Sequence, residues 1–218
     1  MQSATIDELM VAEDPARWES FGFLVEDGAC RLGGLTVRLH GRDAGHAITG
    51  WTLRGLQTTE LDGLPTGRSE APVRMPAAEH PNGVIAIDHV VAITPDLERT
   101  VAALRGAGLD LRRVREEPTP AGAPRQAFFR LGEEILEVVQ EPTEVLERAG
   151  GRGRPAHFWG LAFKATEIER VAAAFGEHAG EIRPAVQRRR QIVTIRRSAG
   201  LAVPIAVMSE PVRAREPA

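Results

Sequence analysis

The sequence predicts an α+β fold built from repeated βαβββ units, and one repeated phrase carries this prediction. IDHVVAITPDLERTVAALRGAGL at residues 87–109 returns in altered form as FWGLAFKATEIERVAAAFGEHAG at residues 158–180. Each copy reads as a strand, a turn and an amphipathic helix, and short strands follow each copy. A weaker third copy begins the chain, with Glu8 in the place of His89.

The middle unit is expected at residues 84–141 and opens with a strand at 87–93. A helix at 96–107 follows, because Leu97, Val101 and Leu104 recur at helical spacing. Three further strands are expected at residues 111–116, 125–130 and 134–140.

The last unit, at residues 156–210, repeats this plan. Its helix carries a one-sided apolar face formed by Ile168, Val171, Ala172 and Phe175. The expected elements are a strand at 158–164, the helix at 167–178 and strands at 182–187, 191–197 and 203–208. The first hairpin after the helix turns on Arg188, Arg189 and Arg190, where glycine or asparagine is usual, so we expect a wide loop there. These arginines are either a solvated turn or a contact for an anionic ligand group.

The N-terminal residues 1–59 read as a degenerate βαβββ-like unit, with strands expected at 5–11, 35–39 and 47–54. The Pro- and Gly-rich stretches 60–83 and 142–155 read as linkers, and 211–218 as a flexible tail. Three units cannot all pair internally. We therefore expect the N-terminal unit to cover the sheet of the other two or to pair across a homodimer.

Composition narrows the classes of function. The formal charge of −3 comes from basic and acidic residues mixed along the chain, which argues against a nucleic-acid partner. No apolar run is long enough to cross a membrane, and residues 1–9 lack the features of a signal peptide, so a cytoplasmic location is expected. Cys30 is the single cysteine, which excludes intrachain disulfides and cysteine-based zinc clusters.

Two polar residues stand on otherwise apolar strand faces. His89 shares its face with Val91, and Glu137 shares its face with Val139. A buried carboxylate is costly unless it is protonated, hydrogen-bonded, ion-paired or bound to a metal. His89 and Glu137 can therefore partner each other or jointly hold a divalent cation. Because burial raises the pKa of a carboxyl group, Glu137 is also a candidate catalytic acid or base.

At residues 84–208 the chain resembles the vicinal oxygen chelate superfamily, which includes glyoxalases, bleomycin-resistance proteins and extradiol dioxygenases. The motifs that carry the resemblance are IDHVV, PDLERTVAAL, GAGL, RQAFFRLG and EILEVV. The resemblance implies that paired βαβββ modules form a cupped mixed β-sheet around a pocket. It also implies metal ligands at His89, on a first strand, and at Glu137, on a last strand.

The second module departs from this metal-binding pattern. Gly160 stands at its first ligand position, and Ile205 or Ala206 at its second. The set of metal ligands is therefore incomplete unless Glu8 supplies a third one. His157 lies three residues before Gly160, and this odd offset places its side chain on the opposite face of the strand. Gly160 is expected to widen the cavity.

The same strand-face reasoning suggests further ligand contacts. The substrate-binding candidates are Arg125, Gln126, His157, Trp159, Gln187 and Arg190. Three functions stay open. The first is binding of a small organic molecule in the cup, with no cofactor. The second is a lyase, isomerase or dioxygenase that uses one divalent ion (Zn, Fe, Mn, Ni or Co) held by His89 and Glu137. The third is a structural or interaction protein that kept the fold only.

Overall fold

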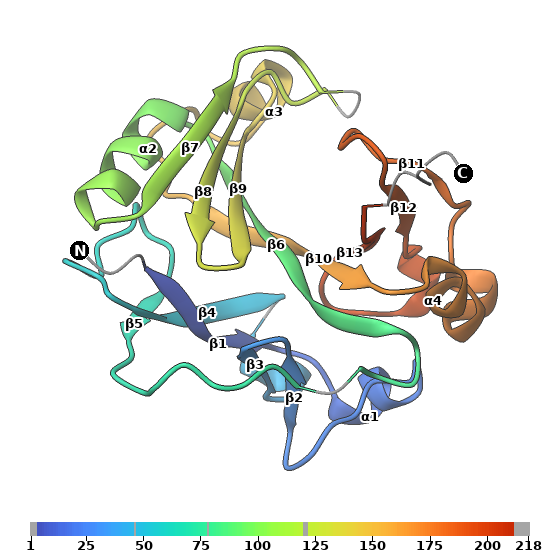
Figure 1. The fold of residues 1–218 in the computed structure, drawn as a ribbon. Coiled ribbons are helices and arrows are strands. Elements are labelled where there is room, and N and C mark those ends of the chain that lie inside the picture. Colours follow the sequence, from blue (N-terminus) through green and yellow to red (C-terminus); the bar gives the residue numbers. More distant parts are fainter. Residues whose placement is uncertain (1–3, 46, 78, 120–121, 212–218) are drawn as a thin grey trace, which may run out of the picture.

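The computed structural model describes residues 4–45, 47–77, 79–119 and 122–211, which form two β-sheets around a shared hydrophobic core (Figure 1). Sheet A has the strand order β2-β3-β1-β4-β5, and sheet B has the order β11-β12-β13-β10-β6-β9-β8-β7. The strands of sheet A are β1 (Thr5–Val11), β2 (Ala29–Leu32), β3 (Leu35–Leu39), β4 (Ile48–Arg54) and β5 (Thr66–Arg68). Those of sheet B are β6 (Val84–Thr94), β7 (Asp110–Arg115), β8 (Gln126–Leu131), β9 (Glu134–Gln140), β10 (His157–Ala165), β11 (Arg183–Pro184), β12 (Gln191–Thr194) and β13 (Ile205–Ser209).

Sheet B consists of two βαβββ units with the same internal pairing. In the first unit β6 pairs in parallel with β9, and β8 and β7 follow in antiparallel order. In the second, β10 pairs in parallel with β13, and β12 and β11 follow. An antiparallel pairing of β6 with β10 joins the units. The sheet curls so that its end strands β7 and β11 face each other (Figure 1). The α+β fold with paired modules is thus confirmed.

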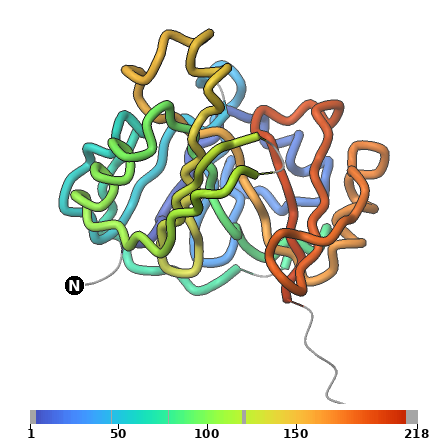
Figure 2. The backbone as a smooth tube through the Cα atoms, turned by 90° about the horizontal axis from the view of Figure 1, so that it is seen from above, coloured from blue at the N-terminus to red at the C-terminus, as the bar shows by residue number. Residues whose placement is uncertain are grey.

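The helices of the two units cover the outer face of sheet B. The α-helices of the structure are α1 (Pro15–Glu19), α2 (Leu97–Gly106), α3 (Thr143–Arg148) and α4 (Ile168–Phe175). Asp96 caps α2 by accepting a hydrogen bond from the backbone N–H of Arg99 at 3.1 Å. The helix α2 packs on β7, β8 and β9, whereas α4 packs on β12 and β13, so the two lie at opposite flanks of the molecule (Figure 2). The concave face of sheet B therefore stays open.

Sheet A repeats part of the same pairing. Strand β1 lies parallel to β3 and β2 lies antiparallel to β3, as β6, β9 and β8 do in sheet B. The strand predicted to end the N-terminal unit is β4, and it lies on the other side of β1, in the position that β10 holds against β6.

Two stretches predicted as linkers also hold regular structure, since β5 falls within residues 60–83 and α3 within 142–155.

The N-terminal sheet packs on the centre of sheet B within one chain. Trp18 meets Phe163 edge-on at a centroid distance of 5.7 Å, and Trp51 meets Phe158 at 5.0 Å. Trp18, Trp51 and Phe163 are fully buried. Of the two arrangements expected for the N-terminal unit, the structure has the one in which it covers the sheet.

Several boundaries differ from the predicted ones. The strand expected at 182–187 is reduced to Arg183–Pro184, because Pro184 has no N–H to extend the ladder and the loop 185–190 turns away. The helix expected at 167–178 ends at Phe175 and continues as a short 3₁₀ turn. Residues 212–218 of the expected tail lie outside the described residues.

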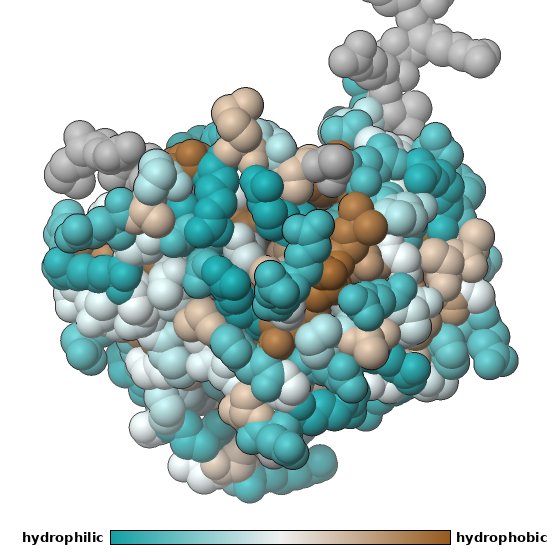
Figure 3. All heavy atoms as spheres, turned by 90° about the horizontal axis from the view of Figure 1, so that it is seen from below, coloured by the Kyte–Doolittle hydropathy of each residue, from teal (hydrophilic) through white to brown (hydrophobic). Residues whose placement is uncertain are grey.

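One face of the molecule is mostly polar. The face shown in Figure 3 is largely hydrophilic, with small hydrophobic areas between charged side chains. Within the described part of the chain, no helix has the length and apolar character needed to cross a membrane.

Candidate functional site

The concave face of sheet B encloses a cleft of about 890 Å³ between the two units. Its inner surface is formed by His89, Gln126, Phe128, Glu137, Ile192 and Met208. Its rim is formed by Arg113, Arg115, Glu116 and Glu117 on one side and residues 184–188 on the other. Residues from both ends of the sheet thus meet around one space, which the curvature of sheet B produces.

The predicted pair of His89 and Glu137 meets in this cleft. Strands β6 and β9 run parallel, and Val91 lies opposite Glu137. His89 is two residues before Val91 on β6, so its side chain is on the same face of the sheet as that of Glu137. The distance between His89 Nε2 and Glu137 Oε2 is 3.4 Å. Gln126 Nε2 donates a hydrogen bond to the other carboxylate oxygen of Glu137. Burial raises the pKa of Glu137, and the nearby charges of His89 and Arg115 only partly oppose this effect.

Asp88 is a site residue that the strand pattern missed. The pairing of β6 with β10 shifts between His89 and Ile87, which leaves Asp88 as the extra residue of a β-bulge. The Asp88 carboxylate accepts a hydrogen bond from His89 Nδ1 at 2.9 Å and forms an ion pair with Arg190. Regular alternation would turn Asp88 away from His89, and no local signal in the sequence marks the bulge.

Asp88 determines the orientation and the tautomer of the His89 ring. Burial alone would raise the pKa of this carboxyl group, but hydrogen bonds from His89 and Arg190 outweigh it and lower the pKa to about 2. An ionised Asp88 holds the proton on His89 Nδ1. The Nε2 atom of His89 therefore faces Glu137 and the cleft. Arg190 also donates from Nε to the backbone carbonyl of Ser209 at 2.7 Å, which ties the β11–β12 loop to this site.

Of the other residues predicted to bind substrate, only some lie at the cleft. Gln126 and Gln187 line the cleft, and Arg190 reaches it through Asp88. Arg125 instead forms ion pairs with Glu98 and Glu116 at the outer edge of the cleft, and these ion pairs hold its side chain away from the cleft interior.

His157 and Trp159 do not reach the cleft. Both line a separate apolar hollow of about 690 Å³ beside β4, with Ile48 and Pro204 among its other residues. The pairing of β10 with β6 shifts between Phe158 and Gly160, so Trp159 is a bulged residue, and its side chain is 47% exposed.

The second-module ligand positions are closed to metal binding. In the register of the two units Ala206 is the counterpart of Glu137, because Ala162 pairs with Ala206 as Val91 pairs with Glu137. A Cβ atom at Gly160 would lie 2.9 Å from the carbonyl oxygen of Pro204. The expectation that Gly160 widens the cavity is therefore wrong, since backbone fills that space.

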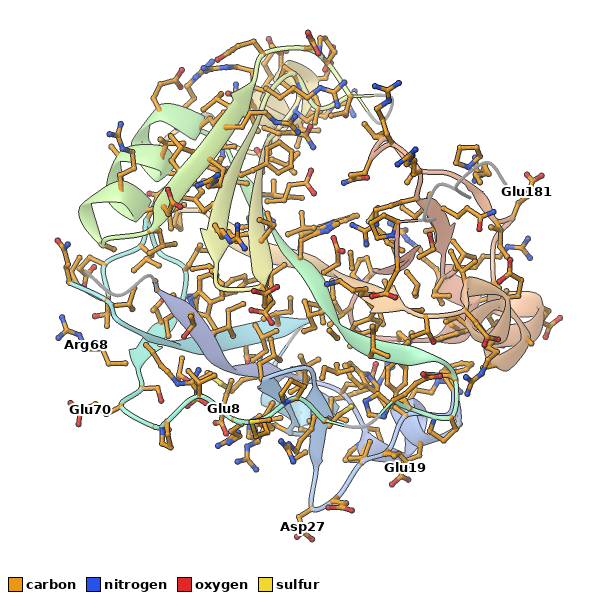
Figure 4. The ribbon with its side chains drawn as sticks, in the orientation of Figure 1. Glu8, Glu19, Asp27, Arg68, Glu70 and Glu181 are labelled. Carbon is orange, nitrogen blue, oxygen red and sulfur yellow. The ribbon has the colours of Figure 1, made fainter. Side chains whose placement is uncertain are left out.

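Glu8 does not complete a ligand set. It lies in sheet A, away from the concave face of sheet B (Figure 4), and forms an ion pair with Arg38 at 2.8 Å. Across the described residues, no three or more His, Cys, Asp and Glu side chains are arranged to hold a metal ion. The side chains present thus do not fit the metal-ligand set that the family resemblance implies.

Comparisons with known proteins agree with this fold. The family model of the Glyoxalase/Bleomycin resistance protein/Dioxygenase superfamily matches residues 86–191. A search of curated proteins found no significant match.

Among solved structures, a methylmalonyl-CoA epimerase is 20% identical with a TM-score of 0.47, over 59% of this chain and 97% of its own. The methylmalonyl-CoA epimerase from Mycobacterium tuberculosis is 16% identical with a TM-score of 0.47, over 62% of this chain and 92% of its own. A fusion protein of a xylose isomerase-like TIM barrel and a 4-hydroxyphenylpyruvate dioxygenase is 12% identical with a TM-score of 0.59.

The match to the fusion protein covers 97% of this chain and 50% of the fusion protein, so it includes both sheets A and B. At this identity it shows a shared fold alone. The family match over residues 86–191 and the paired βαβββ units of sheet B identify a domain of the vicinal oxygen chelate superfamily in this part of the chain.

Proposed function

We propose that the cleft of sheet B binds a small organic molecule and does so without a metal ion. Its volume of about 890 Å³ lies within the range typical of small-molecule sites. Phe128, Ile192 and Met208 offer an apolar surface, and His89, Gln126 and Glu137 add a few converging polar groups. This combination of apolar walls with few polar anchors is typical of ligand sites.

Gln126 is the polar residue most suited to contact a ligand. It is 7% exposed, and its Oε1 atom has no hydrogen-bond partner among the described residues. Leaving a buried amide oxygen without a partner costs about 1–3 kcal/mol. If the Gln126 amide rotates toward the cleft, a hydrogen-bonding group of a bound molecule would remove this cost.

The argument for metal-independent binding rests on the side chains present. Gly160 and Ala206 have no donor atoms, and the two remaining family positions, His89 and Glu137, contact each other. Zinc sites in proteins usually take three or more protein ligands. The single observation that carries the proposal is this contact between His89 and Glu137 at the inner surface of a cleft whose other half lacks ligands.

A second candidate function is proton transfer, and the position of Asp88 favours it. Asp88 directs the Nε2 atom of His89 into the cleft, where it lies 3.4 Å from Glu137 Oε2, an atom of a carboxyl group whose pKa is raised. His89 Nε2 would accept a proton from a carbon of the ligand, and Glu137 in its protonated form would donate one. Such a pair suits an isomerase or a lyase.

The decisive experiment combines metal analysis with dye binding. The chain is purified without chelator, its metals are quantified, and the neutral dye N-phenyl-1-naphthylamine is titrated by fluorescence. The substitution Ile192→Trp fills the cleft, and Val145→Trp on the exposed helix α3 is the matched control.

We expect no stoichiometric metal, and dye binding that Ile192→Trp abolishes and Val145→Trp leaves intact. Stoichiometric Zn, Fe, Mn, Ni or Co that disappears in His89→Ala would instead establish the metal-dependent alternative. Absence of both metal and cleft binding would leave a protein that kept the fold only.

The predicted homodimer stays a prediction. Sheet A covers β6 and β10 within one chain, so sheet pairing does not require a second copy. Light scattering coupled to size-exclusion chromatography distinguishes a 23.6 kDa monomer from a dimer.

A further inference from the structure

Two arginines at the rim of the cleft lack an acidic partner in the part of the chain that the structure describes. Arg113 lies on β7 and Arg188 in the β11–β12 loop, so they come from opposite ends of sheet B to one cleft. Among the described residues, neither has a carboxylate oxygen within 4.0 Å. By contrast Arg125, which lies just outside the cleft, is bound by two glutamates.

Arg113 is held over the interior of the cleft. Its guanidinium carbon lies 4.8 Å from the centre of the Phe128 ring, a cation–π geometry. Phe128 lines the cleft, so the stacked guanidinium is fixed at the boundary between the apolar interior and the solvent. An arginine fixed in this way still offers its N–H donors to a ligand.

The acidic groups of the cleft already have partners. Glu116 is bound by Arg125, Glu117 lies 3.5 Å from Arg115, and Glu137 accepts a hydrogen bond from Gln126. None of these carboxylates has an oxygen within 4.0 Å of a side-chain nitrogen of Arg113 or Arg188. The rim therefore carries an excess of positive charge above an apolar interior.

We propose that the molecule bound in the cleft is an organic anion, whose acidic group lies between Arg113 and Arg188 and whose apolar part contacts Phe128, Ile192 and Met208. This inference rests on the proposed function, because it names the chemical class of the ligand of that same cleft. Guanidinium groups pair with carboxylate, sulfonate or phosphate oxygens through charge-assisted hydrogen bonds. The two modules would each contribute one cation, so binding depends on both edges of the sheet.

The test uses two dyes that differ by one acidic group. 8-Anilinonaphthalene-1-sulfonate carries a sulfonate, and N-phenyl-1-naphthylamine is the same ring system without it. Dissociation constants of both are measured for the parent protein and for Arg113→Ala, Arg188→Ala and Arg113→Lys. The matched controls are Arg112→Ala, the neighbour of Arg113 on β7, and Arg189→Asn, which suits the positive φ of 64° at that position.

We expect each alanine substitution to raise the dissociation constant of the sulfonate dye about tenfold, the usual effect of losing one charge-assisted hydrogen bond. The neutral dye should change by less than about twofold, because it makes no charged contact. Arg113→Lys and both control variants should retain most of the affinity for the sulfonate dye. Circular dichroism and thermal melting confirm that the variants fold, which exposed arginines on a rim should permit.

Equal response of the two dyes to the arginine variants would overturn the anion proposal. If the neutral dye is still lost in Ile192→Trp, the proposed function survives that result. If Ile192→Trp weakens the binding of neither dye, both proposals fail: that the cleft is a binding site and that it prefers anions.

Discussion

Replacing Asp88 with asparagine tests the central hydrogen-bond chain of the site. The carboxylate binds His89 Nδ1 at 2.9 Å and pairs with Arg190, and its side chain is 11% exposed. Its pKa falls from the ordinary 3.8 to about 2 in the folded chain. This difference corresponds to about 2 kcal/mol of folding free energy, since one pKa unit is worth 1.36 kcal/mol.

The pH dependence distinguishes this account from a general packing defect. Because the folded pKa lies below the unfolded one, the stabilisation is complete above about pH 5 and is lost as the pH falls through 2. Asp88→Asn should therefore lower the free energy of unfolding by about 2 kcal/mol at pH 7 and by about half as much at pH 3. Urea unfolding followed by circular dichroism at several pH values measures both quantities.

The control for this substitution is Asp110→Asn, which removes an exposed carboxylate that pairs with Arg112. It should change stability by less than about 0.5 kcal/mol, as exposed ion pairs usually do. Equal effects of the two substitutions, or a loss in Asp88→Asn that does not change between pH 3 and pH 7, would refute the reasoning.

Three further predictions concern the fold and its buried groups. Gly160→Ala should destabilise the chain by about 1–3 kcal/mol, because the new Cβ would lie 2.9 Å from the Pro204 carbonyl oxygen; Gly106→Ala, with open space around it, should change stability by less than about 1 kcal/mol. Burial raises the pKa of Glu134 to about 7, so the folded chain binds the proton more tightly and loses stability as the pH rises from about 4.5 through 7. Glu134→Gln should then stabilise the chain by up to about 3 kcal/mol at pH 8 and leave it unchanged at pH 4, which urea unfolding measures; equal effects at both pH values would contradict this. Phe163→Ala should cost about 3–5 kcal/mol and keep a single thermal transition, because Phe163 of sheet B packs on Trp18 and Phe23 of the N-terminal unit; two separate transitions would show that the N-terminal unit and sheet B unfold independently.

Much of the fold could be predicted because the repeat carries it. The strands Thr5–Val11, Leu35–Leu39 and Glu134–Gln140 begin and end where their alternating patterns do. The position of β4 could not be predicted, because strand patterns do not say on which side of β1 a strand pairs. The short strand β5 lies among prolines and glycines, where local sequence favours a loop.

The site was predicted where regular alternation holds and missed where it breaks. His89, Gln126 and Glu137 meet in the cleft because their strands follow the two-residue period. Asp88 and Trp159 both lie at β-bulges, which reverse the face that a residue count assigns. Arg113 lies on β7 and Arg188 in the β11–β12 loop, at opposite ends of sheet B, and only the curvature of the sheet brings them to one cleft.

The most direct test of the account is histidine NMR of the purified chain. Long-range ¹H–¹⁵N spectra report the protonation of each ring nitrogen, and His89→Gln assigns the signal. We predict a proton on His89 Nδ1, held by Asp88, and a spectrum that one equivalent of Zn²⁺ leaves unchanged. A proton on Nε2 alone, or a stoichiometric shift of the His89 signals on addition of Zn²⁺, would contradict a metal-independent site built on Asp88, His89 and Glu137.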